Sequence, residues 1–191
     1  MFELLLKSIA EKVSSTEDEL QICKNYFTPK KLRKRQFLLQ EGDVCNRIAF
    51  VEKGALYSYS TDAKGVQHVI QFAFEGWWIA DLYSFFTREP SKLSIEVLEE
   101  TELLILDYEQ HHSMLKNVPQ YETYTRIVYQ NAYVALQRRL EGTTGLSAEE
   151  KYARLLEQYS SILNRVPLHL VASYLGVTPE TLSRIRKQMT Q

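Results

Sequence analysis

The sequence predicts an α+β protein in which helices flank an antiparallel β-roll of the double-stranded β-helix or jelly-roll type. Three observations support this fold class. Residues 36–107 alternate short apolar runs with glycine turns, a pattern typical of closely spaced antiparallel strands. The flanking residues repeat apolar side chains at helical spacing. Residues 166–189 have the pattern of two short helices joined at a glycine.

The composition fits a folded protein with an almost neutral charge. Of the 191 residues 45% are hydrophobic, which is enough for a core and excludes global disorder, and the formal net charge is −1. From residue 179 onward, however, Arg184, Arg186 and Lys187 outnumber the single carboxylate, Glu180. Any nucleic-acid surface is therefore expected near the C-terminal end of the sequence.

Two further features bear on the cellular compartment. Cys23 and Cys45 do not have the spacing of metal ligands and are expected to be free thiols in a reducing cytosol. The apolar run within residues 1–12 is too short for a signal peptide, and no segment approaches the roughly 18 apolar residues of a membrane span. We therefore expect a cytoplasmic protein without a membrane partner.

The chain is expected to start with a helix and an edge strand. Residues 2–27 are interpreted as helix because Leu5, Ile9 and Val13 fall at helical spacing. The strongly basic tract 30–35 is either a nucleic-acid patch or a solvated strand edge. We favour the edge, because edge strands often carry lysine against aggregation.

The roll itself is expected to contain several tight connections. Val51–Gly54 and Asp62–Gly65 are interpreted as hairpin turns, since each ends in glycine between two apolar runs. Residues 95–106 predict two further strands around Glu99-Glu100-Thr101.

A long helix is predicted at Pro119–Glu141, and its apolar seam is too narrow for a globular core. The seam suits a coiled-coil dimer interface in which Asn131 fixes the register. The alternative is packing on the chain's own barrel, and both can hold. The glycine-rich residues 142–145 are expected to be a linker, and 148–163 the next helix. The seam consists of Tyr121, Tyr124, Val128, Asn131, Ala135 and Arg138, flanked by Ile127 and Val134.

The last segment predicts a helix-turn-helix with helices at Leu168–Leu175 and Pro179–Met189. Gly176 can take the left-handed conformation that ends a helix, and Thr178 can cap the next one. Leu182 and Ile185 are expected to face inward, leaving polar side chains on an outer face that suits the major groove. The alternative is an ordinary two-helix corner with a solvated charged face. The candidate DNA-binding residues are Thr178, Glu180, Thr181, Ser183, Arg184, Arg186 and Lys187.

The order of elements and four local motifs resemble the Crp/Fnr family of bacterial regulators, and the resemblance covers almost the whole chain. The motifs are EGD at 41–43, FVEKGALYSY at 50–59, Gly65, and PETLSR at 179–184. The resemblance implies a cyclic-nucleotide-binding-type domain at 1–141 and a DNA-binding domain at 146–191. It also implies a homodimeric, sequence-specific transcription regulator whose partners are double-stranded DNA and RNA polymerase.

The resemblance also implies roles within PETLSR. Glu180 stands where the family accepts a hydrogen bond from a cytosine amino group, and Arg184 where it reads a guanine or a phosphate. Arg186 and Lys187 are expected to contact phosphates. Pro179 replaces the arginine of cyclic-AMP responders, so we expect a different operator. Few residues follow Lys187, so no β-hairpin wing is expected.

The nucleotide signature of the family is degraded in this sequence. Asp81-Leu82 stands in place of Glu-Leu, and Ser91-Lys92 in place of the Arg-Ser that grips a cyclic phosphate, while Arg88 could serve only in a shifted loop. Cyclic AMP binding is therefore not expected, no cofactor is assigned, and these five residues are a weak set of effector-site candidates. Two cysteines also cannot provide the four ligands of an iron–sulfur cluster.

Aromatic side chains are dense in the same region, at Phe72, Phe74, Trp77, Trp78, Tyr83, Phe85 and Phe86. We favour their packing in the barrel core over an aromatic-lined effector site.

Two other function classes stay open. One is a sensor or adaptor that does not bind DNA, and the other is a cupin-like metal enzyme on the roll. The enzyme is disfavoured because its metal would need clustered histidines, whereas His68, His111, His112 and His169 are scattered. We therefore assign no catalytic residue and no metal ligand.

Overall fold

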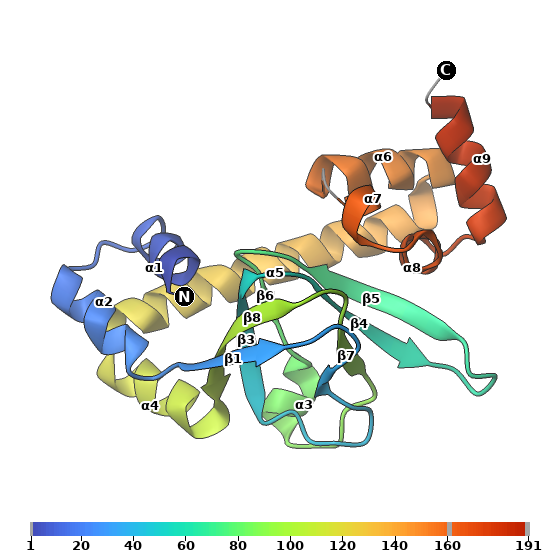
Figure 1. Cartoon of the computed structure of the whole chain (residues 1–191). Coiled ribbons are helices and arrows are strands. Elements are labelled where there is room, and N and C mark those ends of the chain that lie inside the picture. Colours follow the sequence, from blue (N-terminus) through green and yellow to red (C-terminus); the bar gives the residue numbers. More distant parts are fainter. Residues whose placement is uncertain (1, 160–161, 190–191) are drawn as a thin grey trace. The chain divides into compact units, whose positions relative to one another are not determined.

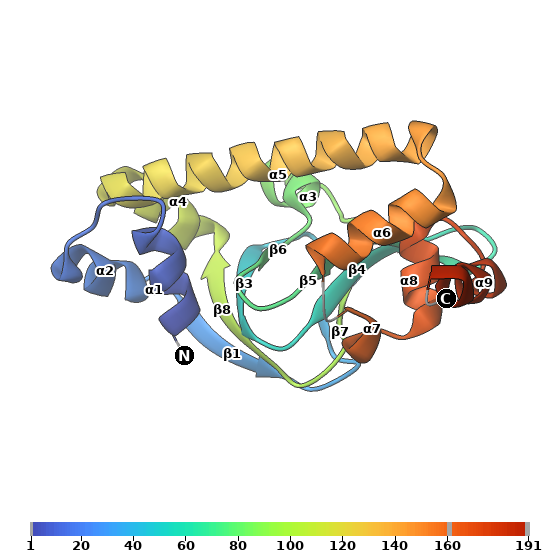
Figure 2. The same ribbon diagram turned by 90° about the horizontal axis from the view of Figure 1, so that it is seen from above.

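The computed structural model of the chain describes residues 2–159 and 162–189, apart from the side chains of residues 143 and 144. The chain divides into two compact units (Figures 1 and 2). Unit 1 comprises Met1–Ser58 and Phe72–Asn131, and unit 2 comprises Tyr59–Gln71 and Ala132–Gln191. The predicted domain boundary between residues 141 and 146 stays a prediction.

The roll consists of two four-stranded sheets in the described residues, and the predicted antiparallel architecture is confirmed. One sheet has the order β1-β8-β3-β6 and the other β2-β7-β4-β5. Successive strands from β1 to β4 alternate between the sheets, as in a jelly roll. The strands are β1 (Thr28–Leu32), β2 (Phe37–Leu39), β3 (Arg47–Lys53), β4 (Leu56–Thr61), β5 (Gln67–Ala73), β6 (Trp78–Ile79), β7 (Ser94–Val97) and β8 (Thr101–Asp107).

The centre of the roll is the pair formed by β3 and β8. Ile48 lies opposite Leu106 and Phe50 opposite Leu104, and all four side chains are buried. The continuous burial of β3 explains its unbroken apolar run, because a strand covered on both faces does not need alternation.

The predicted turn at Val51–Gly54 is not a hairpin. Strand β3 pairs with β6 and β8, whereas β4 lies in the other sheet, so this connection crosses from one sheet to the other. The turn at Asp62–Gly65 does join neighbouring strands, β4 and β5, as predicted. Residues 95–106 also contain two strands as predicted, β7 and β8, again in different sheets.

The helical segment predicted at 2–27 consists of two helices, in agreement with the expected N-terminal helices, although their bounds were not predicted. The segment forms α1 (Glu3–Ala10) and α2 (Glu17–Lys24), separated by a break at which Thr16 and Glu19 form a reciprocal capping box. The start of α1 is held by a distant residue, since the amides of Leu4 and Leu5 donate to the carboxylate of Glu52 at 3.2 and 2.8 Å.

Two helices of unit 1 were not predicted, α3 (Leu82–Thr87) and α4 (Tyr108–Asn117). Helix α3 has only six residues, which is too short to show an apolar period. Its local signal is Asp81, whose carboxylate accepts from the amide of Ser84 at 3.3 Å as an N-cap does.

The long helix α5 (Pro119–Gly145) extends through the residues that were expected to be a linker. Tyr121 and Tyr124 are buried in the core of unit 1, so the start of the helix packs on its own roll. Further along, Tyr133, Leu136 and Leu140 are 62%, 53% and 58% exposed. Packing on the chain's own roll is therefore confirmed for the start of α5, and the coiled-coil interface stays a prediction.

Besides the second half of α5, unit 2 contains four helices among its described residues: α6 (Ala148–Gln158), α7 (Ile162–Arg165), α8 (Leu168–Leu175) and α9 (Pro179–Met189). The predicted helix at 148–163 therefore ends early, at Gln158. Ser147 begins α6 with a capping box to Glu150. None of the described helices is both long and apolar enough to cross a membrane.

Gly54 has a backbone φ of +98°, and a Cβ atom there would lie 2.4 Å from Thr101 Oγ1 and 2.7 Å from the Glu100 carbonyl oxygen. We expect Gly54→Ala to destabilise the fold by about 2–5 kcal/mol, from strain and overpacking together. Thermal unfolding measures this loss. Gly65→Ala is the matched control, because its φ is +81° but a Cβ there meets open space. Equal losses in the two variants would contradict the crowding argument.

Candidate functional site

Helices α8 and α9 are joined by a tight turn at the positions that the sequence predicts. Gly176 has a φ of +70°, in the left-handed region, and its neighbour Val177 donates its amide to the Ala172 carbonyl at 3.0 Å. Thr178 Oγ1 then accepts from the amide of Thr181 at 3.2 Å, which caps α9. Local chemistry therefore sets both the end of α8 and the start of α9.

The inner side of α9 is apolar and fixed. Leu182 and Ile185 are fully buried in unit 2, where Leu170, Val171 and Leu175 of α8 are also buried. The predicted inward residues of α9 are confirmed, and this helix cannot rotate about its axis without exposing them.

Four of the candidate DNA-binding residues share the outer face of α9. Because positions three, four and seven apart lie on one side of a helix, this face carries Glu180, Ser183, Arg184 and Lys187. The other three do not join it. Thr178 and Thr181 place their hydroxyl groups 3.2 Å from each other at the turn, and Arg186 lies on a flank.

The face combines an acceptor with cations. The pKa of the Glu180 carboxyl is lowered by its own backbone amide at the start of α9 and by the Thr178 hydroxyl, so it is an ionised acceptor at neutral pH. Arg184 and Lys187 are exposed on the same side. This is the set of groups that base edges and phosphates can bind.

The candidate effector residues form a closed arrangement in unit 1. Asp81 is 6% exposed and lies at the start of α3, and Ser91 is buried beside it. Ser91 Oγ lies 2.6 Å from Asp81 Oδ2, and Asp81 Oδ1 accepts from the Ser84 amide. The two signature positions therefore satisfy each other, and Leu82 is half-buried next to them.

The cations among the candidates point elsewhere. Arg88 donates to the Cys45 carbonyl at 3.3 Å, contacts Asn46 Oδ1, and lies 4.3 Å over the ring of Tyr108. Lys92 is exposed. None of the five candidates therefore presents a guanidinium beside Asp81, and these residues do not fit a cyclic phosphate, which needs such a group.

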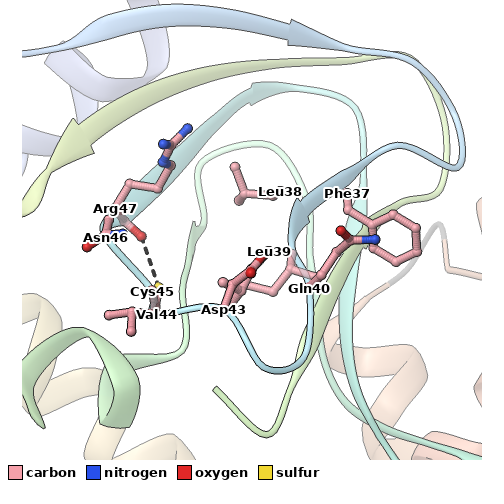
Figure 3. Close-up of a pocket in the computed structure, with 10 residues that line it drawn as sticks. Phe37, Leu38, Leu39, Gln40, Asp43, Val44, Cys45, Asn46 and Arg47 are labelled. Atoms are coloured by element: carbon pink, nitrogen blue, oxygen red, sulfur yellow. Dashed lines mark hydrogen bonds between the residues drawn. The ribbon is translucent and has the colours of Figure 1, made fainter. Parts of the chain in front are cut away.

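A cavity of about 320 Å³ lies at a different place in unit 1, along β2, the loop after it, the start of β3 and β7 (Figure 3). This lining was not predicted from the sequence, and none of the candidate effector or aromatic residues belongs to it. Burial raises the pKa of the Cys45 thiol, which therefore stays protonated and unreactive. The lining residues are Phe37, Leu38, Leu39, Gln40, Asp43, Val44, Cys45, Asn46, Arg47 and Ile95.

The dense aromatic residues split into two groups. Phe72, Phe74 and Phe85 are buried, and Trp78 packs edge to face on Phe50 at 5.3 Å, which supports core packing for this group. Tyr83 and Phe86 of α3 are exposed instead. The ring of Phe86 lies 5.8 Å from that of Tyr129 on α5.

His111 is the only fully buried histidine among the described residues, and it bridges α4 and α5. Its Nδ1 lies 2.9 Å from the Tyr121 hydroxyl and its Nε2 3.4 Å from that of Tyr129. Burial, followed by the charge of His112, lowers the pKa of His111 to about 4. Within the part of the chain that the structure describes, no three histidine, cysteine or carboxylate side chains are grouped as a metal site.

Because His111 is neutral in the fold but titrates near 6.5 in the unfolded chain, its burial costs stability only at low pH. The cost appears as pH falls below about 6.5 and is complete near pH 4. We expect His111→Gln to unfold with a weaker pH dependence than the wild type in this window, measured as the melting temperature at each pH. His169→Gln, at an exposed position, should keep the wild-type slope; an unchanged slope in His111→Gln would refute the assignment.

This arrangement resembles known proteins both in sequence and in fold. The family model of the cyclic nucleotide-binding domain matches residues 29–118, which is the roll with α3 and α4. No curated protein sequence matches the chain. The roll thus matches the model of the cyclic nucleotide-binding domain, and in it Asp81 and Ser91 bind each other.

Solved structures share the fold over most of the chain. CLP of Xanthomonas campestris, described as a c-di-GMP responsive global regulator, has a TM-score of 0.73 at 13% identity, covering 92% of each chain. FixK2 of Bradyrhizobium japonicum has 0.70 at 18%, covering 86% of this chain and 84% of its own. The catabolite activator protein of Thermus thermophilus has 0.59 at 17%, covering 93% and 84%. At these identities the likeness shows a common fold.

Proposed function

We propose that the chain is a sequence-specific DNA-binding transcription regulator that reads the major groove with the outer face of α9. The observation that carries the proposal is the fixed orientation of this helix. Leu182 and Ile185 anchor it, and the acceptor Glu180 and the cations Arg184 and Lys187 stand together on the opposite side. The fold that the chain shares with CLP, FixK2 and the catabolite activator protein supports the same class.

The proposed regulator works without cyclic AMP. The Asp81–Ser91 hydrogen bond fills the place where a nucleotide-binding relative would need a free carboxylate and an arginine. RNA polymerase, the further partner that the family resemblance implies, stays an expectation. The alternative function, a sensor or adaptor that does not bind DNA, keeps the same roll but needs no base-reading face on α9.

We also propose a homodimer formed through α5, on a face that differs from the predicted seam. The predicted seam includes Tyr121 and Tyr124, which are buried in the chain's own core. The exposed apolar side chains Tyr133, Leu136 and Leu140 follow the four-and-three spacing of a coiled coil on another side of the helix. A second copy is the occupant that such a spacing fits best.

Selection of random duplex DNA on the purified protein tests the proposed function. We expect a two-fold symmetric motif with half-sites about one helical turn apart. Arg184→Ala should lose about 1–3 kcal/mol of discrimination at one base pair and keep the wild-type melting temperature, because the side chain is exposed. Arg154→Ala, an exposed arginine on α6, is the control and should bind like the wild type. If no motif is enriched, with or without cyclic AMP, the adaptor becomes the better description.

Leu136→Glu should weaken the dimer, because it places a charge in the proposed seam. Sedimentation at a series of concentrations would show dissociation at higher concentration than for the wild type, by about tenfold or more. Asn131→Glu is the matched control, since Asn131 is exposed on the same helix and lies on the side of the predicted seam. Dissociation by Asn131→Glu alone would restore the predicted seam and reject the one proposed here.

A further inference from the structure

The β4–β5 hairpin belongs to the same compact unit as helices α6 to α9. Its residues Tyr59–Gln71 group with Ala132–Gln191 and not with the rest of the roll. Strand β5 is the last strand of its sheet, so one side of its backbone has no strand partner. Unpaired edge groups need other hydrogen-bond partners or solvent.

One serine of α8 satisfies two of these edge groups. Ser173 Oγ donates to the Gln67 carbonyl at 2.9 Å and accepts from the Val69 amide at 3.0 Å. A residue of a parallel strand opposite His68 would bond the same carbonyl and amide. The Ser173 hydroxyl thus replaces one residue of a missing strand and fixes α8 to a defined point of the hairpin.

An arginine of α5 completes the contact. Arg139 Nη2 donates to the Val69 carbonyl at 3.3 Å, and its guanidinium carbon lies 4.3 Å from the ring centroid of Tyr174. Tyr174 follows Ser173 on α8, so the same arginine contacts both the strand and the helix. Val69 is 4% exposed, and the two hydrogen bonds to its backbone are partly buried, whereas the bond from Ser173 to the Gln67 carbonyl is exposed to solvent.

We propose that this contact is a latch that positions the DNA-reading helices, with Ser173 and Arg139 as positioning residues for operator recognition. The proposal rests on the proposed function. Helix α9 packs on α8 through buried side chains, so whatever holds α8 also holds the reading face. Neither Ser173 nor Arg139 lies on that face, and neither needs to contact DNA.

The latch matters because a dimer must present two reading helices at a fixed separation. If α8 were free of the hairpin, the helix pair of each copy would sample more orientations. Binding both half-sites would then cost more orientational entropy. The same freedom would let the dimer accept half-sites at altered spacing. A latch therefore predicts two effects of its removal: weaker binding at the preferred spacing, and a flatter dependence of affinity on spacing.

The first arm of the test uses the full-length protein without DNA. In Ser173→Ala the Val69 amide loses its acceptor, so we expect its hydrogen exchange to accelerate about tenfold or more, with the melting temperature little changed. Ser113→Ala, on α4 in unit 1, is the matched control and should leave this amide unaffected. An unchanged exchange rate in Ser173→Ala overturns the latch.

The second arm measures operator affinity for half-site spacings that differ by one base pair in each direction. The wild type should prefer one spacing, and Ser173→Ala and Arg139→Gln should each bind that spacing about tenfold more weakly and lose most of the preference. Arg154→Gln should behave as the wild type.

Faster exchange with an intact spacing preference would show that the contact is structural only, and would overturn the positioning role. If the wild type bound no DNA, the proposed function and the positioning role would fall, while the exchange arm would still decide whether the hairpin is latched.

Discussion

The structure depends on the way the first turns of α5 are anchored. The Tyr124 hydroxyl lies 3.0 Å from Ser8 Oγ of α1 and accepts a hydrogen bond from Trp78 Nε1 of β6, also at 3.0 Å. The Tyr121 hydroxyl forms a hydrogen bond with His111 of α4. Burial raises the pKa of both tyrosines, so each hydroxyl keeps its proton. Two tyrosines therefore tie the helix to the N-terminal, strand and α4 elements at once.

The roll has the fold of a cyclic nucleotide-binding domain, but the residues at its two signature positions bind each other. In a ligand-binding version, a buried carboxylate with no internal partner would be costly until the ligand arrived. Here Ser91 donates to Asp81, and Asp81 also caps α3. These hydrogen bonds lower the free-energy cost of burying the Asp81 carboxylate without a ligand, and they occupy polar groups that a nucleotide would bind.

The sequence predicts well what is set by local chemistry and poorly what is set at long range. The α8–α9 turn was predicted because Gly176, Thr178 and Pro179 are close in sequence and each has one clear role. The start of α1 was not predicted, since the carboxylate of Glu52 that holds it is distant in the chain. The Ser173–Gln67 contact, separated by 106 residues, left no local pattern. The residues on the outer face of α9 could thus be predicted from the sequence, but the long-range contact between α8 and the β4–β5 hairpin could not.

Helix α5 shows how one periodic element can serve two purposes. Tyr121, Tyr124 and Arg139 lie on one side of it, since their spacings are close to whole turns, and all three contact the chain's own residues. Tyr133 and Leu140 lie on a different side and are exposed, and the exposed Leu136 lies between the two sides. Intramolecular packing thus distinguishes the side of the helix that contacts the chain's own residues from the side whose apolar residues are exposed, and the apolar period alone could not distinguish the two.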